Sequence, residues 1–276
     1  MNFPTVQELF DAGVHVGHQL RRWDPRSKPF IYDHRHGISI IDLEKTLSQL
    51  QRACEFLERL VADGGEVWLV GTKPQAKELI RQQGEQEGIF HCAERWLGGS
   101  LTNYDTVNKG LHKYRKLLQM RERGEIDRMF NKEAASLRRT MARMARNFEG
   151  LLDIAGRPGA IFVVDINREL IAVREARRTG IPVVAIADTN TNPFLADYPV
   201  PGNDDSSRAI RVLLDPVVQA ILLGREEREM RREGKASPRE MVEREPSVVL
   251  SAEAVALAEG LSEEDLAAAE QRQERR

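Results

Sequence analysis

The sequence predicts an α/β protein built on an open, mostly parallel β-sheet with helices on both faces. Three short apolar runs, at residues 66–70, 160–165 and 182–188, have the length and composition of buried strands. A stretch with helical character follows each run. Parallel strands need long crossover connections, and helices of this length supply them, so the alternation predicts parallel pairing.

The sequence also marks the ends of these elements. Pro74 stands in the first turn of the helix that follows the first strand, where its missing N–H leaves no hydrogen bond unmade. Gly180 closes the helix after the second strand, because glycine readily adopts the left-handed conformation of a C-terminal cap. The third helix is apolar and carries Pro216 as a kink or break. The run 38–41, followed by a helix that begins near Asp42, predicts one further β–α unit.

Residues 103–155 interrupt the alternation with two seven-residue apolar repeats. The repeats consist of Val107, Leu111, Tyr114 and Leu118, and of Leu137, Met141, Met144, Phe148, Leu151 and Ala155. This pattern predicts two helices, each on the order of 25–35 Å long, packed as an antiparallel coiled-coil hairpin. We therefore expect a sheet domain (1–102 and 156–224), an inserted hairpin (103–155) and a charged, acidic tail (225–276).

The charge of the chain is nearly balanced but unevenly placed. The net charge is −2, from 41 basic and 43 acidic residues. Residues 101–150 carry 12 basic and six acidic side chains, a net +6, whereas residues 225–276 carry 10 and 14, a net −4. Residues 21–36 carry five basic side chains against two acidic ones, together with Trp23 and Tyr32. Two cationic elements in a near-neutral chain favour RNA as a partner.

The composition places the protein in a reducing compartment. The start of the chain lacks the basic residues and apolar run of a signal peptide, and no apolar run approaches the length of a membrane helix. The chain has two cysteines, and Cys54 falls on the apolar stripe of a predicted helix, as a buried thiol would. We therefore expect a cytoplasmic protein with no membrane partner.

Phosphate-binding and metal-binding motifs are absent from this sequence. The stretch RWLGGSLTN (95–103) has two glycines where a dinucleotide fingerprint needs three, and no P-loop pattern occurs. The spacings of His15 and His18, and of His34 and His36, match no zinc motif. We expect no metal, cofactor, small-molecule substrate or catalytic residue.

Four aspartates near the ends of strands or the start of a helix keep a second hypothesis open. They are Asp165, Asp188, Asp204 and Asp205. The carboxyl edge of a parallel sheet is where α/β enzymes hold catalytic groups, although aspartates also cap helices and close turns. An α/β enzyme acting on a phosphorylated or nucleotide substrate is therefore the alternative. A free-standing RNA-binding or interaction module is the third hypothesis.

Six motifs together identify a family that the chain resembles. They are HVGHQLRRWDPRSKPFIY (15–32), ISIIDLEKT (38–46), GTK (71–73), RWLGGSLTN (95–103), GIPVVAIADTN (180–190) and YPVPGNDD (198–205). With these motifs in order between residues 5 and 224, the chain resembles the bacterial small-ribosomal-subunit protein two family.

The resemblance implies a flavodoxin-like, doubly wound sheet with an inserted coiled-coil hairpin. It implies a structural constituent of the small ribosomal subunit that contacts small-subunit rRNA and neighbouring ribosomal proteins. It also implies help in recruiting the large multidomain ribosomal protein one near the messenger RNA exit. The chain departs from the family pattern at residues 191–194, which lack the usual acidic side chains, and at Ser39, where a histidine is common. Acidic or metal contacts of relatives at these positions are therefore not carried over.

We expect the basic segment and the hairpin to bind rRNA phosphates on a rigid α/β platform. The candidate rRNA-binding residues are Arg21, Arg22, Arg26, Lys28, Arg95, Lys109, Lys113, Lys116, Arg139, Arg143 and Arg146. Gly98 and Gly99 are expected to form the turn that leads the chain out of the sheet, with Thr102 or Asn103 capping the first hairpin helix. For Trp23 and Trp96, packing in the core is favoured over stacking on a base.

Overall fold

The computed structural model describes residues 2–154 and 156–234 of the 276-residue chain. The chain divides into a compact unit, Met1–Glu229, and a second unit, Met230–Arg276. The sheet and its covering elements belong to the first unit, and helix α7 (Ser207–Arg232) ends in the second. The acidic tail predicted from residue 225 thus starts within a helix, and residues 235–276 of it lie outside the described part.

A parallel sheet of five strands forms the centre of the first unit. Its strands are β4 (Val67–Val70), β5 (His91–Cys92), β6 (Ala160–Val164), β7 (Val183–Ala187) and β8 (Tyr198–Pro201). They lie in the order β5-β4-β6-β7-β8. Numbered along the chain this is 2-1-3-4-5, the order of flavodoxin-like doubly wound sheets. The three strands predicted from sequence are confirmed, each to within one residue at either end.

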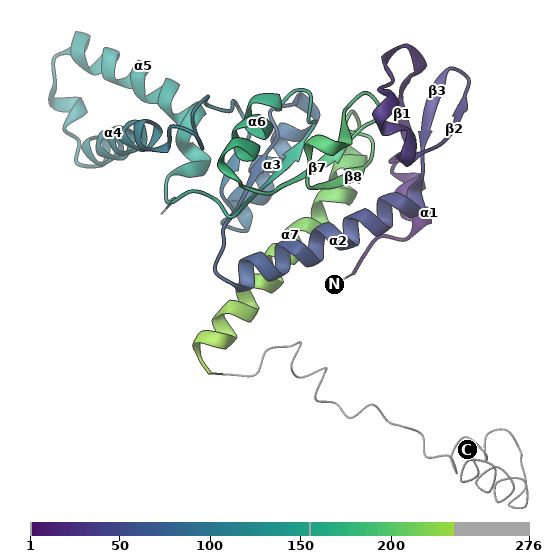
Figure 1. Ribbon diagram of the computed structural model, residues 1–276. Coiled ribbons are helices and arrows are strands. Elements are labelled where there is room, and N and C mark those ends of the chain that lie inside the picture. Colours follow the sequence, from purple (N-terminus) through teal and green to yellow (C-terminus); the bar gives the residue numbers. More distant parts are fainter. Residues whose placement is uncertain (1, 155, 235–276) are drawn as a thin grey trace, which may run out of the picture. The chain divides into compact units, whose positions relative to one another are not determined.

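Helices cover both faces of the parallel sheet (Figure 1). Besides α7, the described residues form the α-helices α1 (Val6–Asp11), α2 (Leu43–Ala62), α3 (Pro74–Gln86), α4 (Tyr104–Glu122), α5 (Asn131–Phe148) and α6 (Leu170–Thr179). The alternation along β6 shows how the faces divide. Phe162 and Val164 pack in the core with α2, α3 and α7, whereas Ile161 and Val163 pack in the core with α6 and the start of the hairpin. Gly180 closes α6 with a φ of +72°, as predicted.

The N-terminal region contains the strand and the helix of the predicted further β–α unit, but the strand belongs to a second sheet. The strands β1 (Val16–Gln19), β2 (Ile31–Arg35) and β3 (Ile38–Ile41) form a separate antiparallel sheet in the order β1-β3-β2. The run 38–41 therefore does not extend the parallel sheet, although α2 follows it as expected. The basic segment 21–36 contains the end of a short 3-10 helix, a second 3-10 helix (Pro25–Phe30) and β2. In β2, buried and exposed residues do not alternate along the strand, so the sequence carries no alternating apolar pattern from which this strand could be predicted.

The two helices of the insertion pack against each other in antiparallel fashion (Figure 1). Tyr114, in the middle of α4, stacks on Phe148 at the end of α5, with ring centroids 6.3 Å apart. Near the turn between the helices, Leu117, Ala134 and Met141 form a small core of their own. The residues closer to the sheet, including Leu111, instead belong to the core on the α6 face. The repeats thus mark a helix pair whose lower half is part of the sheet core, and a coiled-coil geometry stays a prediction. Ala155, the last residue of the predicted repeat, lies outside the described residues.

Candidate nucleic-acid interface

The hairpin presents six of the predicted basic side chains to solvent. All six are exposed: Lys109, Lys113, Lys116, Arg139, Arg143 and Arg146. None of them forms an ion pair with any described residue, in contrast to Arg138, which lies 2.6 Å from Asp127. Lysines and arginines without an internal partner are free to neutralise phosphates.

The two basic triplets lie on opposite outer sides of the hairpin. Each α-helical residue turns the chain by 100°, so Lys109, Lys113 and Lys116 lie on the side of α4 opposite its apolar seam. Arg139 and Arg143, together with Arg146, stand in the same relation to the seam of α5. Because the seams face each other, the triplets face apart. The hairpin therefore offers two cationic surfaces rather than the single one that net charge suggests.

The N-terminal basic segment, residues 21–36, carries four of its five basic side chains on two short 3-10 helices and the fifth, Arg35, on β2. Arg21, Arg22, Arg26 and Lys28 are all exposed. Arg26 is already engaged, since its guanidinium forms two hydrogen bonds with the carboxylate of Asp24, at 2.9 and 2.7 Å. The other three have no ion pair among the described residues, so they are the stronger phosphate ligands of this segment.

The segment is fixed to the loop that follows β7. The backbone N–H of Asp24 donates to the carbonyl of Thr189 at 2.9 Å, and the hydroxyl of Ser27 donates to the carbonyl of Thr191 at 2.7 Å. From α2, the ammonium group of Lys45 donates to the carbonyl of Pro29 at 2.8 Å. These bonds reach from a short, mostly exposed segment to the sheet and to α2, so the basic side chains are carried on an ordered backbone.

Trp96 and Trp23 differ in their surroundings. Trp96 is buried and packs near Trp68, with ring centroids 6.4 Å apart, so it is a core residue and is not available to stack on a base. Trp23 is half-buried and meets the ring of His34 edge-on at 5.5 Å. Core packing, the favoured prediction, holds for Trp96.

The loop RWLGGSLTN surrounds an anion, but the anion is the protein's own. The backbone N–H groups of Gly99, Leu101 and Thr102 donate to the carboxylate of Glu175 on α6. These backbone N–H groups are therefore already occupied by a side chain of the protein and are not available to bind a phosphate. Arg95, at the start of the loop, is exposed and has no ion pair among the described residues.

The turn at the loop uses one of its two glycines. Gly99 has a φ of +94°, the left-handed conformation, whereas Gly98 does not. Asn103 takes the N-cap position of the first hairpin helix, as predicted, but its side chain forms no capping hydrogen bond. The Thr102 hydroxyl donates to Glu175. The competing acceptor, a buried carboxylate from α6, could not be foreseen locally.

A cluster of ionisable groups, which we call the carboxylate cluster, gathers at the carboxyl edge of the sheet. It comprises Lys73, His18, Asp165, Asp188, Asp204 and Asp205. The Lys73 ammonium lies 2.6 Å from oxygens of Asp204 and Asp205, and 3.2 Å from Asp165. Burial, with Asp188 and Asp165 nearby, raises the pKa of Asp204 to about 7. Sequence reasoning identified the aspartates but missed the lysine that holds them.

The arrangement of the carboxylate cluster is that of an internal salt-bridge network. Burial alone would lower the pKa of Lys73, but Asp204, Asp205 and Asp165 raise it, so the lysine stays charged and unsuited to act as a base. Ligand atoms of His18, Asp188 and Asp204 lie within 4.8 Å of one another, close enough for a metal ion. In the described structure these groups already have partners. The Lys73 ammonium pairs with Asp204, and the ring nitrogen Nδ1 of His18 lies 3.0 Å from an oxygen of Asp188.

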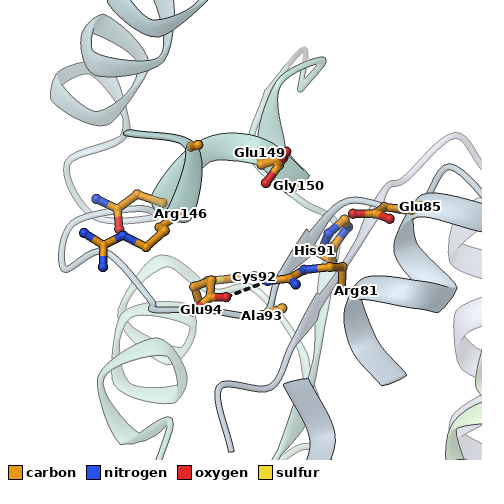
Figure 2. A pocket seen from close by; sticks show the side chains of 11 residues that line it. Arg81, Glu85, His91, Cys92, Ala93, Glu94, Arg146, Glu149 and Gly150 are labelled. Carbon is orange, nitrogen blue, oxygen red and sulfur yellow. Dashed lines mark hydrogen bonds and ion pairs between the residues drawn. The ribbon is translucent and has the colours of Figure 1, made fainter. Parts of the chain in front are cut away.

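A hollow between α3, β5 and the end of α5 is too small for a substrate (Figure 2). Its volume of about 20 Å³ is close to the space of one water molecule. Figure 2 shows Arg81 and Glu94 joined across it, at 2.5 Å. Burial raises the pKa of the neighbouring Cys92 thiol to about 12, so it is not an activated nucleophile.

A larger hollow, of about 570 Å³, lies on the N-terminal side of the sheet domain. It is lined by Phe10, His15 and Tyr32 together with neighbouring residues. Phe10 stacks on His15 at 4.3 Å, and burial lowers the pKa of His15. This arrangement pairs no nucleophile with a base.

None of the described helices has both the length and the apolar content needed to cross a membrane.

Comparison with known proteins gives one consistent family. Residues 9–224 match the sequence model of the family described as ribosomal protein S2. The small ribosomal subunit protein uS2 of Opitutus terrae is 50% identical over 233 residues, which are 84% of this chain and 77% of that protein. The uS2 protein of Coprothermobacter proteolyticus is 46% identical over 225 residues, 82% of this chain and 84% of its own. That of Treponema pallidum is 44% identical over 218 residues, 79% of this chain and 75% of its own.

Proposed function

The chain belongs to the ribosomal protein S2 family, and from that premise we propose that it is a structural component of the small ribosomal subunit. The family is structural and not enzymatic. The relatives named above carry the name of a small-subunit protein, which supports the same role here. In this proposal the chain is ribosome-bound and its partners are small-subunit rRNA and neighbouring ribosomal proteins.

The observation that carries the rRNA part of the proposal is the set of exposed basic side chains that form no ion pair with any described residue. Ten of the eleven predicted phosphate ligands have this character, and Arg26, which pairs with Asp24, is the exception. In the proposal, residues 103–155 are the RNA-binding element, and the sheet domain is the rigid support that carries it. Since the triplets of α4 and α5 face apart, the hairpin lies between two RNA segments and contacts one with each triplet.

The proposal extends to a protein partner. The resemblance to the family supports a role in recruiting the large multidomain ribosomal protein one near the messenger RNA exit. We assign no residue of this chain to that contact.

Charge reversal on each side of the hairpin tests the rRNA proposal. Lys113→Glu/Lys116→Glu and Arg139→Glu/Arg143→Glu each change the charge by four units, as does the control Arg52→Glu/Arg59→Glu on α2. Each hairpin variant is expected to reduce incorporation into small subunits at least tenfold, because about two phosphate contacts are lost on one side. Gradient sedimentation of small subunits measures the bound fraction, and circular dichroism checks the fold.

The outcomes separate the hypotheses. If both hairpin variants incorporate as well as the control, the hairpin does not contact rRNA. If only one variant is impaired, the hairpin contacts RNA on one side and the two-sided arrangement is wrong. Wild-type protein that stays in the soluble pool and turns over a nucleotide would support the α/β enzyme alternative.

A further inference from the structure

We propose that Glu175 is a positioning residue that sets the direction of the hairpin by holding the loop from which α4 starts. The inference rests on the proposed function, because direction matters only if the hairpin must meet RNA at fixed points. The carboxylate lies on α6, and the loop leads directly into α4 at Tyr104.

Five hydrogen bonds converge on this one carboxylate. Oε1 accepts from the backbone N–H of Gly99 at 2.7 Å and from the indole N–H of Trp96 at 3.3 Å. Oε2 accepts from the backbone N–H groups of Leu101 at 3.0 Å and Thr102 at 3.3 Å, and from the Thr102 hydroxyl at 3.2 Å. All five donors come from residues 96–102, so the carboxylate fixes that loop at both ends and in its middle. We call this set of bonds the Glu175 clamp.

The charge of Glu175 is matched by these donors and not by a cation. Glu175 is buried, and no lysine, arginine or histidine of the described residues forms an ion pair with it. Burial alone would raise its pKa, but the bonds from Gly99, Leu101, Thr102 and Trp96 bring the pKa below its ordinary value. The side chain is therefore ionised at neutral pH. A glutamine of the same shape would replace one acceptor oxygen with an N–H₂ group that opposes the loop's own N–H donors.

The Glu175 clamp lies at the start of α4, where a small change in the direction of the helix produces a large displacement of its far end. Two residues after its last donor, α4 begins and runs for 19 residues, about 28 Å at 1.5 Å per residue. A tilt of about 10° at the start moves the far end of such a helix by about 5 Å. Phosphate contacts tolerate less than 1 Å, since hydrogen bonds to ionised oxygens span about 2.7–2.9 Å. Fixing the loop therefore governs whether the far basic residues meet their phosphates.

The other bonds near the start of the hairpin hold it together without orienting it. Tyr114 stacks on Phe148, and the Arg115 guanidinium donates to the carbonyl of Leu152, so both join α4 to the end of α5 or the segment after it. Apolar packing of Leu111 against the α6 face adds contact area, but apolar contacts are not directional. Asn103 offers no side-chain cap. Among these contacts, only the Glu175 clamp is a directional polar attachment of the loop to the sheet domain.

Pulsed electron paramagnetic resonance on the full-length protein tests the proposal. Nitroxides at Glu122→Cys, at the end of α4, and Glu78→Cys, on α3, report the position of the hairpin; both sites are exposed, and the native cysteines are buried. Glu175→Gln is expected to broaden the distance distribution at least twofold. The matched control is Glu169→Gln, which removes another buried carboxylate, one that binds Thr72 instead of the loop, and should leave the width unchanged.

A graded variant and a pH series protect the test against simple loss of folding. Thr102→Val removes one of the five donors and should broaden the distribution less than Glu175→Gln. Acidification through the lowered pKa of Glu175 should broaden the wild-type distribution and leave Glu175→Gln unchanged. An unbroadened distribution in folded Glu175→Gln, or equal broadening in Glu169→Gln, overturns the proposal.

Subunit incorporation of the same variants separates this inference from the proposed function. With the hairpin loosened, incorporation of Glu175→Gln should fall several-fold below that of Glu169→Gln. If the distribution broadens while incorporation stays at the control level, the positioning role of Glu175 stands and the rRNA contact of the hairpin falls.

Discussion

The hairpin and the N-terminal basic segment are both cationic, but they are attached to the sheet by opposite electrostatic means. The hairpin starts from a loop held by a buried anion, Glu175, whose hydrogen-bond donors among the described residues are all neutral. The N-terminal segment rests on the loop after β7, next to a cluster in which Lys73 and His18 offset several aspartates. The comparison teaches that, Arg26 excepted, the basic side chains assigned to RNA form no ion pairs with the described residues, whereas internal pairing uses other residues such as Lys73. We call the carboxylate cluster and the Glu175 clamp the two anchors. The carboxylate cluster depends on the charge of Lys73, whereas the Glu175 clamp needs no cation.

Removing Lys73 should produce the largest effect on stability and should leave the direction of the hairpin unchanged. Lys73→Met leaves Asp165, Asp204 and Asp205 without their shared cation, which should lower the free energy of unfolding by about 3–5 kcal/mol. Part of this loss should return on acidification, because protonation of Asp204, whose pKa is raised by burial and by Asp188 and Asp165 and is no longer lowered by Lys73, removes one unpaired buried charge. Urea denaturation at a series of pH values measures both effects.

The control for Lys73→Met is Lys77→Met, on the same helix. Lys77 pairs with Glu94 at 2.6 Å, but both side chains are partly exposed, so its loss should cost below about 1 kcal/mol. Equal losses for the two variants would mean that the carboxylate cluster contributes no more than a surface pair. Broadening of the hairpin distance distribution in Lys73→Met would contradict the independence of the two anchors.

The two anchors should respond to pH in opposite directions. The pKa of Glu175 is lowered, so its stabilising contribution is complete above the ordinary glutamate pKa and is lost as pH falls through the lowered value. A hydrogen bond that the His18 ring donates to the Asp188 carboxylate, with the charges of Asp188, Asp204 and Asp205, raises the pKa of His18. Its contribution is complete below the ordinary histidine pKa and is lost as pH rises through the raised value.

Stability differences between wild type and two variants measure this contrast. The gap between wild type and Glu175→Gln should shrink on acidification, and the gap between wild type and His18→Gln should shrink on moving to alkaline pH. Chemical denaturation in buffers of constant ionic strength supplies both curves. If both stability differences change in the same direction with pH, the prediction that the two anchors respond oppositely to pH is wrong.

The smallest predicted effect distinguishes the two glycines of the hairpin loop. Gly99→Ala should cost about 1 kcal/mol, because Gly99 has a φ of +94° and an added Cβ would lie 3.2 Å from that of Asn103. Gly98→Ala should change stability by less than about 0.5 kcal/mol, since an added Cβ meets nothing within 4 Å. Thermal unfolding of both variants checks the pair, and equal shifts would place the turn at neither glycine.

The sequence predicted the parallel sheet well because buried strands leave a strong local signal. Runs such as 160–165 are apolar on both faces, and their ends fall within one residue of β6. The antiparallel sheet at 16–41 left no such signal, because β2 has exposed residues along most of its length. Its pairing depends on tertiary contacts that propensity does not encode.

The sequence predicted that the basic side chains of the candidate site are exposed. It did not predict the buried polar contacts that attach the hairpin and the N-terminal segment to the sheet domain. Basic residues at helical spacing opposite an apolar seam indicate a solvent-facing surface, and the exposed triplets of α4 and α5 have that character. Glu175 gave one usable signal, since it lies three residues after buried Ala172 and so on the apolar face of its helix. Its partners are more than 70 residues away in sequence, and Lys73 is 131 residues from Asp204. No local pattern links such pairs.

The position of the hairpin within the strand order has a consequence for folding. Strand β4 pairs with β6, which joins Val67 to Ala160 across the whole insertion. The central strand pair therefore cannot form on a nascent chain until β6 has left the ribosome tunnel. The hairpin can form earlier, because its distal core, from Leu117 to Met144, uses contacts that are local in sequence. A folded hairpin shortens the loop that must close between β4 and β6, so the element proposed to bind rRNA also lowers the entropy cost of completing its own platform.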